Sequence, residues 1–152
     1  MKKIVLLFIT MVVLIGCSNE DKVNFTVISE SNLVENNDVS IKELEYDEAI
    51  MDSTFSIFNK EELKNGLYMF NTSEDRSYIL FRSEGVHYSN ISFTIEEDVL
   101  KIKYDSEEDE GLGMNTLFLV EKNDENAYDT VDLQNNGKQD FFNVVFVGKA
   151  NN

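Results

Sequence analysis

The alternation of apolar and polar residues between Ile91 and Tyr104 constrains the fold more than any other feature of the chain. Apolar side chains recur at every second position on either side of a short acidic stretch, at Ile91, Phe93, Ile95, Leu100, Ile102 and Tyr104. A period of two is that of a β-strand with one buried face, and the intervening Glu96-Glu97-Asp98 predicts a turn. The pattern therefore predicts an antiparallel hairpin whose exposed face carries Ser92 and Thr94 opposite lysines.

Further short apolar runs, separated by segments rich in Asn, Asp and Ser, predict a mainly β fold. The expected strands are Thr54–Phe58, Ser77–Arg82, Thr116–Val120, Tyr128–Leu133 and Phe141–Val147, and Leu67–Phe70 is apolar enough for burial in either state. Asn135-Asn136-Gly137 predicts a hairpin turn, because a tight type I′ turn needs two residues of positive φ. Val39–Ile50 is ambiguous between strand and helix, with the strand preferred, and Asn59–Leu63 predicts one short helix. About seven or eight strands with one short helix indicate a mainly antiparallel sandwich or open barrel.

The first seventeen residues form a separate segment. Lys2 and Lys3 precede the apolar run Ile4–Ile15, which is shorter than the roughly 20 residues that a membrane-spanning helix needs. The run ends in Leu14-Ile15-Gly16-Cys17, and polar residues follow it. A basic start, a short apolar core and a small residue before a cleavage point are typical of signal peptides, so the segment predicts an N-terminal signal helix.

Leu14-Ile15-Gly16-Cys17 resembles the lipobox of bacterial lipoprotein signal peptides. The resemblance implies transfer of a diacylglyceryl group to the Cys17 thiol and cleavage between Gly16 and Cys17. Two acyl chains hold a protein stably in a membrane, where one chain would not. The expected location is therefore the outer face of the cell membrane, and the Lys, Asn, Ile and Glu usage is compatible with a Gram-positive source.

The rest of the chain has the length of one domain. We divide the sequence into a signal peptide (1–16), the lipidated cysteine with a polar tether (17–38) and a single β-rich domain (39–150). Cys17 is the only cysteine, so the mature domain forms no disulfide and no cysteine-based zinc site.

The chain is strongly acidic. Its formal net charge is −16, and loss of Lys2 and Lys3 with the signal peptide makes the mature protein −18. This charge excludes a nucleic-acid partner, because nucleic-acid-binding proteins supply cations to the phosphates. Anionic lipid head groups would also repel the domain, so the lipid is expected to be its only attachment to the membrane. The acidity suits a cationic ligand or an envelope protein as the partner.

Asp132, Gln134, Asn136 and Asp140 are the candidate metal ligands. The segment that contains them resembles the Asp-x-Asn-x-Asp-Gly-x-x-Asp loops of extracellular calcium-binding repeats, with Gln134 in place of the usual Asn or Asp. Two carboxylates imply only weak calcium binding. A plain Asn-Gly hairpin explains the same residues, and both interpretations stay open. The acidic run Asp105–Gly113 is expected to be a loop, and its spacing does not match the helix-loop-helix calcium pattern.

The sequence carries no catalytic constellation. His87 is the only histidine, which excludes a metal site built on two histidines, and it is expected to lie in a loop. Nothing marks an activated nucleophile, and acids are so abundant that any pair of carboxylates is uninformative. We therefore expect a protein that is not an enzyme and binds no cofactor other than weakly held calcium.

Phe141 and Phe142 are the candidate binding patch. They are adjacent in an expected strand and would point to opposite faces, so one of them is expected to be exposed.

One further resemblance concerns the order of the elements. The segment 54–63, the strand Tyr78–Phe81 and the hairpin 89–104 together look somewhat like the small β domains of lipoproteins that attach to and modulate bacterial proteases. Those domains carry a Gly-Gly-Tyr motif, where this chain has Gly85–Asn90. The sequence therefore predicts a lipid-anchored extracytoplasmic binding module without catalytic activity. An envelope hydrolase using carboxylates and a calcium-responsive structural module are the alternatives.

Overall fold

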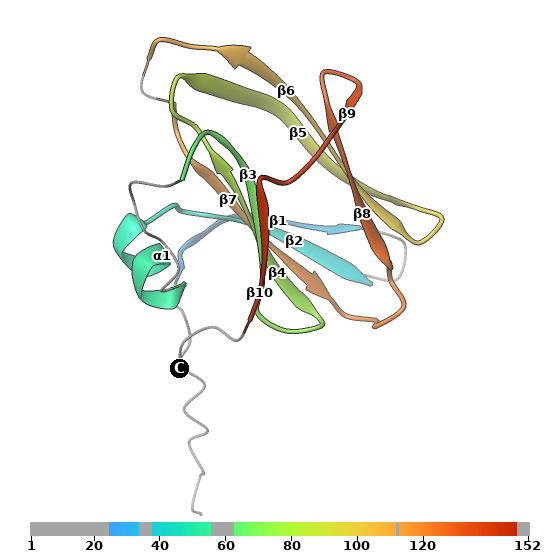
Figure 1. Ribbon diagram of the computed structural model, residues 1–152. Coiled ribbons are helices and arrows are strands. Elements are labelled where there is room, and N and C mark those ends of the chain that lie inside the picture. The colour runs from blue at the N-terminus through green and yellow to red at the C-terminus, as the bar shows by residue number, and fades with distance from the viewer. Residues whose placement is uncertain (1–24, 34–37, 56–62, 112, 149–152) are drawn as a thin grey trace, which may run out of the picture.

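Two β-sheets pack face to face in the computed structural model, and one short helix lies against the outer face of the larger sheet (Figure 1). The structure describes residues 25–33, 38–55, 63–111 and 113–148, which contain ten strands and one helix. The prediction of a mainly β sandwich with a single short helix is confirmed. The signal helix with its lipobox, Gly16 and Cys17 included, lies outside the described residues.

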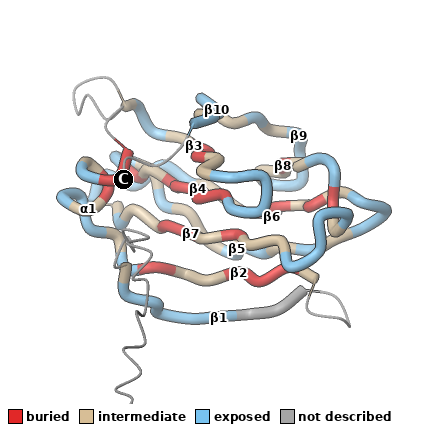
Figure 2. The backbone as a smooth tube through the Cα atoms, turned by 90° about the horizontal axis from the view of Figure 1, so that it is seen from below, coloured by how far each residue is buried: buried red, intermediate tan, exposed pale blue. Residues whose placement is uncertain are grey.

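The larger sheet has six strands. In order across the sheet they are β1 (Val27–Leu33), β2 (Val39–Leu44), β7 (Thr116–Lys122), β4 (Arg76–Arg82), β3 (Gly66–Asn71) and β10 (Val144–Val147). Neighbours are antiparallel except for β10, which runs parallel to β3. The strands β1 and β10 therefore form the two opposite edges of this sheet (Figure 2).

The smaller sheet has four strands. In order they are β5 (Val86–Glu96), β6 (Val99–Glu108), β8 (Thr130–Asn135) and β9 (Lys138–Asp140). The pairs β5–β6 and β8–β9 are antiparallel hairpins, whereas β6 runs parallel to β8. Antiparallel pairing therefore dominates as expected, and one parallel pair in each sheet joins strands that do not follow one another directly in the chain.

The main apolar core lies between the two sheets. Its buried members are Val39, Ile41, Leu67, Met69, Ile79, Phe81, Leu100, Ile102, Tyr104, Phe118, Val120, Tyr128 and Leu133. The hairpin expected over 91–104 lies in this position with the expected faces. On its outer face Ser92 pairs with Lys103 and Thr94 pairs with Lys101. The period of two therefore identified both the strands and the side that they bury.

A second apolar layer covers the outer face of the larger sheet, beneath helix α1 (Glu48–Thr54). The buried residues of this layer are Leu44, Met51, Phe55, Tyr68, Phe70, Tyr78, Leu80 and Leu117. The central strands β3, β4 and β7 are thus covered on both faces, which explains why their sequences are nearly continuous apolar runs.

The described helix, α1, lies partly in a segment for which the sequence favours a strand. The ambiguous segment Val39–Ile50 contains β2 and the start of α1, and Thr54, expected to open a strand, is the last helical residue. The Asp47 carboxylate caps the helix by accepting a hydrogen bond from the Ile50 amide at 3.0 Å. Residues 56–62, which hold most of the strand expected over 54–58 and of the helix expected over 59–63, lie outside the described residues. No helix of the described ranges is long and apolar enough to cross a membrane.

The folded region also begins before residue 39, which corrects the length of the predicted tether. Val27–Leu33 pairs with β2 from Leu33 opposite Val39 to Val27 opposite Leu44, with one irregularity in the register between Val27 and Ser29. The described side chains of β1 are exposed (Figure 2), so backbone hydrogen bonds to β2 hold this strand. An apolar pattern reports burial and cannot reveal a strand that is held in this way.

The long hairpin extends into segments that were expected to be loops. Strand β6 continues to Glu108, so much of the run Asp105–Gly113 is strand. Strand β5 begins at Val86, which places His87 in a strand opposite Glu107. Cross-strand pairing orders these residues although acidic side chains have little β-propensity of their own.

Candidate functional site

The four candidate calcium ligands lie on the β8–β9 hairpin, and the structure does not bring them together. Leu133 pairs with Asp140 and Gln134 pairs with Gln139. Directly paired residues share a face of a sheet and successive residues alternate, so Asp132 and Asp140 lie on opposite faces. The hairpin interpretation of this segment therefore accounts for its structure, and the calcium-loop interpretation does not.

Both carboxylates already accept hydrogen bonds from the protein. Asp132 accepts from the side-chain amides of Gln134 at 3.0 Å and Gln139 at 2.7 Å. Asp140 accepts from the hydroxyl of Tyr104 and from the Phe141 amide at 2.8 Å. Nowhere in the described ranges do three His, Cys, Asp or Glu side chains lie close enough together to hold a metal ion.

Asn136 has a different role from the metal ligand that the sequence suggested. It and Gly137 have φ values of 50° and 73°, as the predicted type I′ turn requires. Its side-chain amide donates to the Ser106 carbonyl at 3.0 Å and so ties the turn to the end of β6.

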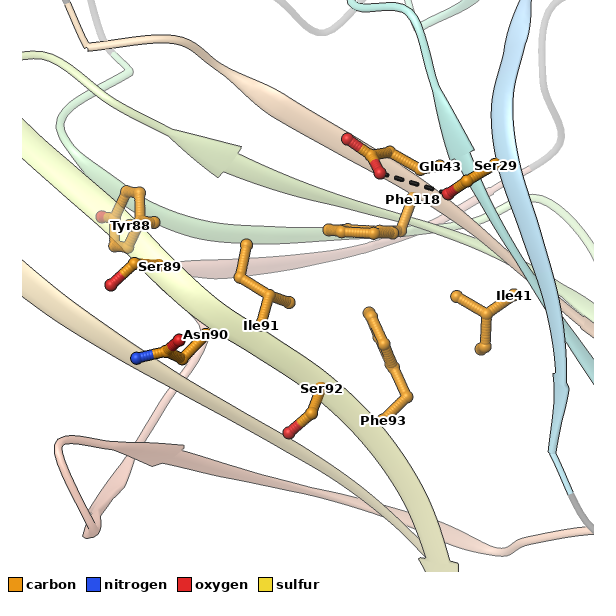
Figure 3. A pocket seen from close by; sticks show the side chains of 10 residues that line it. All are labelled: Ser29, Ile41, Glu43, Tyr88, Ser89, Asn90, Ile91, Ser92, Phe93 and Phe118. Atoms are coloured by element: carbon orange, nitrogen blue, oxygen red, sulfur yellow. Dashed lines mark hydrogen bonds between the residues drawn. The ribbon is translucent and has the colours of Figure 1, made fainter.

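A groove of about 430 Å³ lies between the sheets on the side where β1 and β5 form their edges (Figure 3). Its apolar floor includes Ile41, Phe93 and Phe118, and the last two rings meet edge to face with centroids 4.9 Å apart. Of the described residues that line the groove, Glu43 alone carries a carboxylate, and it accepts a hydrogen bond from Ser29 at 3.2 Å. A glycosidase-type site needs two carboxylates, so this groove does not have that arrangement.

The opposite edge of the larger sheet carries an exposed apolar surface, which we call the β10 strip. It consists of Phe141 (73% exposed), Val144 (41%), Val145 (47%) and Val147 (84%). Figure 2 shows this edge of the sheet largely in the colour of exposed residues. The neighbouring Phe142 is partly buried against the core between the sheets. Of the two phenylalanines that the sequence selected, Phe141 is therefore the exposed one.

Strand β10 is firmly attached to β3 on its inner side. The ring of Phe146 stacks on Phe70, with centroids 4.9 Å apart and planes within 5° of parallel. Just before the strand, the Asn143 amide donates to the Leu67 carbonyl at 2.7 Å. The Asn143 side chain packs so closely on Gly66 that a Cβ there would overlap its amide group, and Gly66 also has a φ of 135°. Glycine at position 66 thus lets the chain cross between the sheets at this point.

The backbone of β10 points alternately toward β3 and away from it. The Gly148 amide donates to the Asn71 carbonyl at 3.2 Å, so Phe146, two residues earlier, also directs its backbone groups toward β3. The N–H and C=O groups of Val145 and Val147 consequently point to the open edge. Among the described residues, no strand pairs with that edge.

A second groove, of about 620 Å³, adjoins the β10 strip. Its apolar lining includes Met69, Tyr128, Val131 and Val147. Burial raises the pKa of Tyr128 to about 12. The Lys122 ammonium lies 4.1 Å from the centre of the Tyr128 ring and donates to the Tyr128 carbonyl at 2.6 Å.

The rim of this second groove is acidic. Glu74 and Asp129 line the groove itself, and Asp75 and Glu125 line an adjoining hollow that shares Glu74 and Lys122 with it. Lys122 is the one basic residue among the described residues that line either hollow. The strip therefore combines exposed valines, unpaired backbone groups and a rim of negative charge.

Sequence reasoning identified this site only in part. The pair Phe141-Phe142 was a partial signal: one of the two is exposed as expected, but both lie between β9 and β10, because the strand expected over 141–147 begins only at Val144. The run Val144–Val147 gave no signal of an exposed site, because an apolar run predicts a buried strand unless its place at a sheet edge is known. Comparisons with protein-family models, with curated proteins and with solved structures found no match to this chain.

Proposed function

We propose that this protein is a lipid-anchored, non-catalytic binding module on the outer face of the bacterial cell membrane, and that it binds another envelope protein through the β10 strip. The observation that carries the proposal is the exposed edge itself. Soluble proteins usually protect an apolar edge strand with charges, proline or a covering element, because such an edge pairs readily with other chains. Among the described residues no strand pairs with this apolar edge, which lies beside an apolar groove and is therefore a surface for a partner.

The position of the anchor agrees with this use of the strip. Strand β1 begins at Val27, ten residues after Cys17, and ten residues reach at most about 35 Å. The tether is thus shorter than the sequence suggested. β1 and β10 are opposite edges of a six-stranded sheet, which places them about 24 Å apart at the usual strand spacing. The anchor would hold the domain near the membrane without covering the strip.

Site-directed crosslinking in intact cells tests the proposal. A photoreactive amino acid replaces Val147 in one variant of the full chain and Thr94 in a matched control. Thr94 is also exposed but lies on the outer face of the smaller sheet. We expect position 147 to yield a discrete crosslinked band in the membrane fraction and position 94 to yield none. Equal labelling from the two positions would show that the strip is not a binding surface.

The anchor is tested separately by Cys17→Ala. We expect this variant to lose the lipid, so that the protein is released from the membrane or left with its signal peptide. Unchanged membrane retention together with unchanged gel mobility would contradict the lipoprotein assignment. The crosslink at position 147 should weaken with Cys17→Ala if the partner is held at the same membrane.

A further inference from the structure

We propose that the β10 edge takes an extended, basic segment of a partner polypeptide, which adds to the larger sheet as a seventh strand beside β10. This inference rests on the proposed function and specifies the chemistry of the partner. It follows from three properties of the edge: the direction of its backbone groups, the apolar surface beside them and the charge of the rim.

The backbone supplies the first argument. The N–H and C=O groups of Val145 and Val147 point away from β3, so the edge presents two donors and two acceptors at strand spacing. An extended peptide satisfies all of them by strand addition, a recurring mode of peptide recognition. Phe146, stacked on Phe70, holds the strand in place before any partner arrives, which lowers the ordering cost of binding.

The side chains supply the second argument. Val145 pairs with Met69, whose side chain lies in the core between the sheets, so Val145 and Val147 both face the side of the smaller sheet. Val147 also lines the second groove together with Tyr128 and Val131. An added strand would therefore direct every second side chain toward this apolar groove. Apolar residues at alternate positions are the expected pattern in the partner.

The negative charge of the rim supplies the third argument, and it favours one kind of partner at the β10 edge over the others. Glu74, Asp75, Glu125 and Asp129 surround the grooves beside the strip, and Lys122 is already engaged by Tyr128. A second copy of a chain with net charge −16 would be repelled, and so would anionic lipid head groups. A segment that carries Lys or Arg between its apolar residues complements this rim.

Peptide binding to the full-length lipidated protein in phosphatidylcholine nanodiscs tests the inference, with empty nanodiscs as the blank. The probe is a fluorescein-labelled peptide of ten residues in which Lys and Val alternate. One control peptide alternates Glu and Val, and another is the Lys-Val peptide with every backbone nitrogen methylated. We expect the Lys-Val peptide to bind at least tenfold more tightly than either control, because only it can both form the ladder and complement the rim.

Two variants locate the binding. Val145→Pro removes an outward N–H, and we expect it to weaken binding at least tenfold. Val147→Lys changes a residue that is 84% exposed, so it should leave the fold intact while repelling the cationic peptide. Thr94→Lys is its matched control, since it adds the same charge on the far sheet. We expect Val147→Lys to weaken binding severalfold and Thr94→Lys to leave it unchanged.

The failures of the two proposals are distinguishable. Equal binding of the methylated peptide, or equal effects of Val147→Lys and Thr94→Lys, would overturn strand addition at β10. Crosslinking of two copies through position 147 would also overturn it, in favour of self-association. The cellular crosslink at position 147 reports any partner protein however it docks, so the proposed function can survive the first of these results.

Discussion

The ring of Phe146 stacks on the ring of Phe70 on the outer face of the larger sheet, and this contact fixes the edge strand β10 to β3. The same strand exposes Val145 and Val147 to solvent on its other face. One side of a four-residue strand therefore stabilises the fold while the other remains open. The proposed binding at the edge and the attachment of the edge to β3 therefore depend on different side chains.

We predict that Phe146→Ala lowers the free energy of unfolding by about 1–2 kcal/mol, through loss of the stacked pair and of part-buried apolar area. Phe141→Ala is the control, because Phe141 is 73% exposed and its loss should change stability by less than about 0.5 kcal/mol. The chain has no tryptophan, so urea unfolding should be followed by circular dichroism. Equal losses in the two variants would mean that the stack does not anchor β10.

A second prediction concerns the charged row on the outer face of the larger sheet. Glu121 accepts hydrogen bonds from Lys42 at 2.7 Å and from Arg76 at 2.8 Å. Burial would raise the pKa of Glu121, but the bonds from these two cations outweigh it and hold the pKa below its ordinary value of 4.5. Stability from this group is therefore present above pH 4.5 and is lost as the pH falls through the lowered value.

Accordingly, Glu121→Gln should cost about 1 kcal/mol at pH 7, and the cost should shrink toward pH 2–3, where the wild-type carboxyl is also neutral. Urea unfolding at a series of pH values measures this difference. Glu125→Gln, at an exposed position in the adjacent loop, is the control and should change stability little at either pH. A cost that is independent of pH would contradict an ionic origin.

A third prediction concerns the phenol of Tyr104, which donates a hydrogen bond to the Asp140 carboxylate. Burial raises the pKa of Tyr104, and the hydrogen bond and the charge of Asp140 raise it further. Because the folded-state pKa is raised, this stability is present below about pH 10 and is lost as the pH rises through the raised value. Tyr104→Phe should cost about 1–2 kcal/mol at pH 7, since it leaves a carboxylate without its phenolic donor.

Stability measured at alkaline pH distinguishes the Tyr104–Asp140 hydrogen bond from simple packing of the Tyr104 ring. Above pH 10, wild-type stability should fall more steeply than that of Tyr104→Phe, as measured by urea unfolding at pH 8 and pH 10.5. Asp140→Asn keeps an acceptor and removes the charge, so it should cost less at pH 7 than Tyr104→Phe. If Asp140→Asn left stability unchanged at every pH while Tyr104→Phe lowered it, the charge of the carboxylate would have no part in the effect.

The buried faces of the central strands could be predicted from the sequence, because burial of one or both faces sets the spacing of a strand's apolar residues. Ile102 and Lys103 alternate as a half-buried strand requires, and Leu117–Val120 is apolar throughout because both faces of β7 are covered. The edges could not be predicted in the same way. Strand β1 is held by its backbone and leaves Val27 and Ile28 exposed, so its residues carry no burial pattern.

In the candidate site, too, local features could be predicted from the sequence, whereas the pairing of residues distant in the chain could not. The turn at Asn136-Gly137 was predictable because its φ values are a local property. The separation of Asp132 from Asp140 depends on which residues pair across the hairpin, and a one-residue shift would have reversed it. The place of β10 beside β3 joins segments about 75 residues apart, as in the pair of Val144 with Tyr68, and no local pattern encodes such a pair.

The two tight hairpin turns give the last prediction, because they solve the same geometric problem with different residues. Glu97 and Asp98 have φ values of 50° and 63°, a left-handed conformation that is strained for Glu and that Asp adopts less readily than Gly, whereas the other turn uses Asn-Gly. Replacing Glu97 and Asp98 with Asn and Gly should stabilise the protein by about 1 kcal/mol, a rise of about 2–4 °C in Tm. The reciprocal change, Asn136→Glu with Gly137→Asp, should destabilise by more than this, since it also removes the Asn136 hydrogen bond to Ser106. Thermal unfolding of both variants measures the difference, and a lower Tm for the first would mean that the left-handed conformation of Glu97 and Asp98 carries no strain.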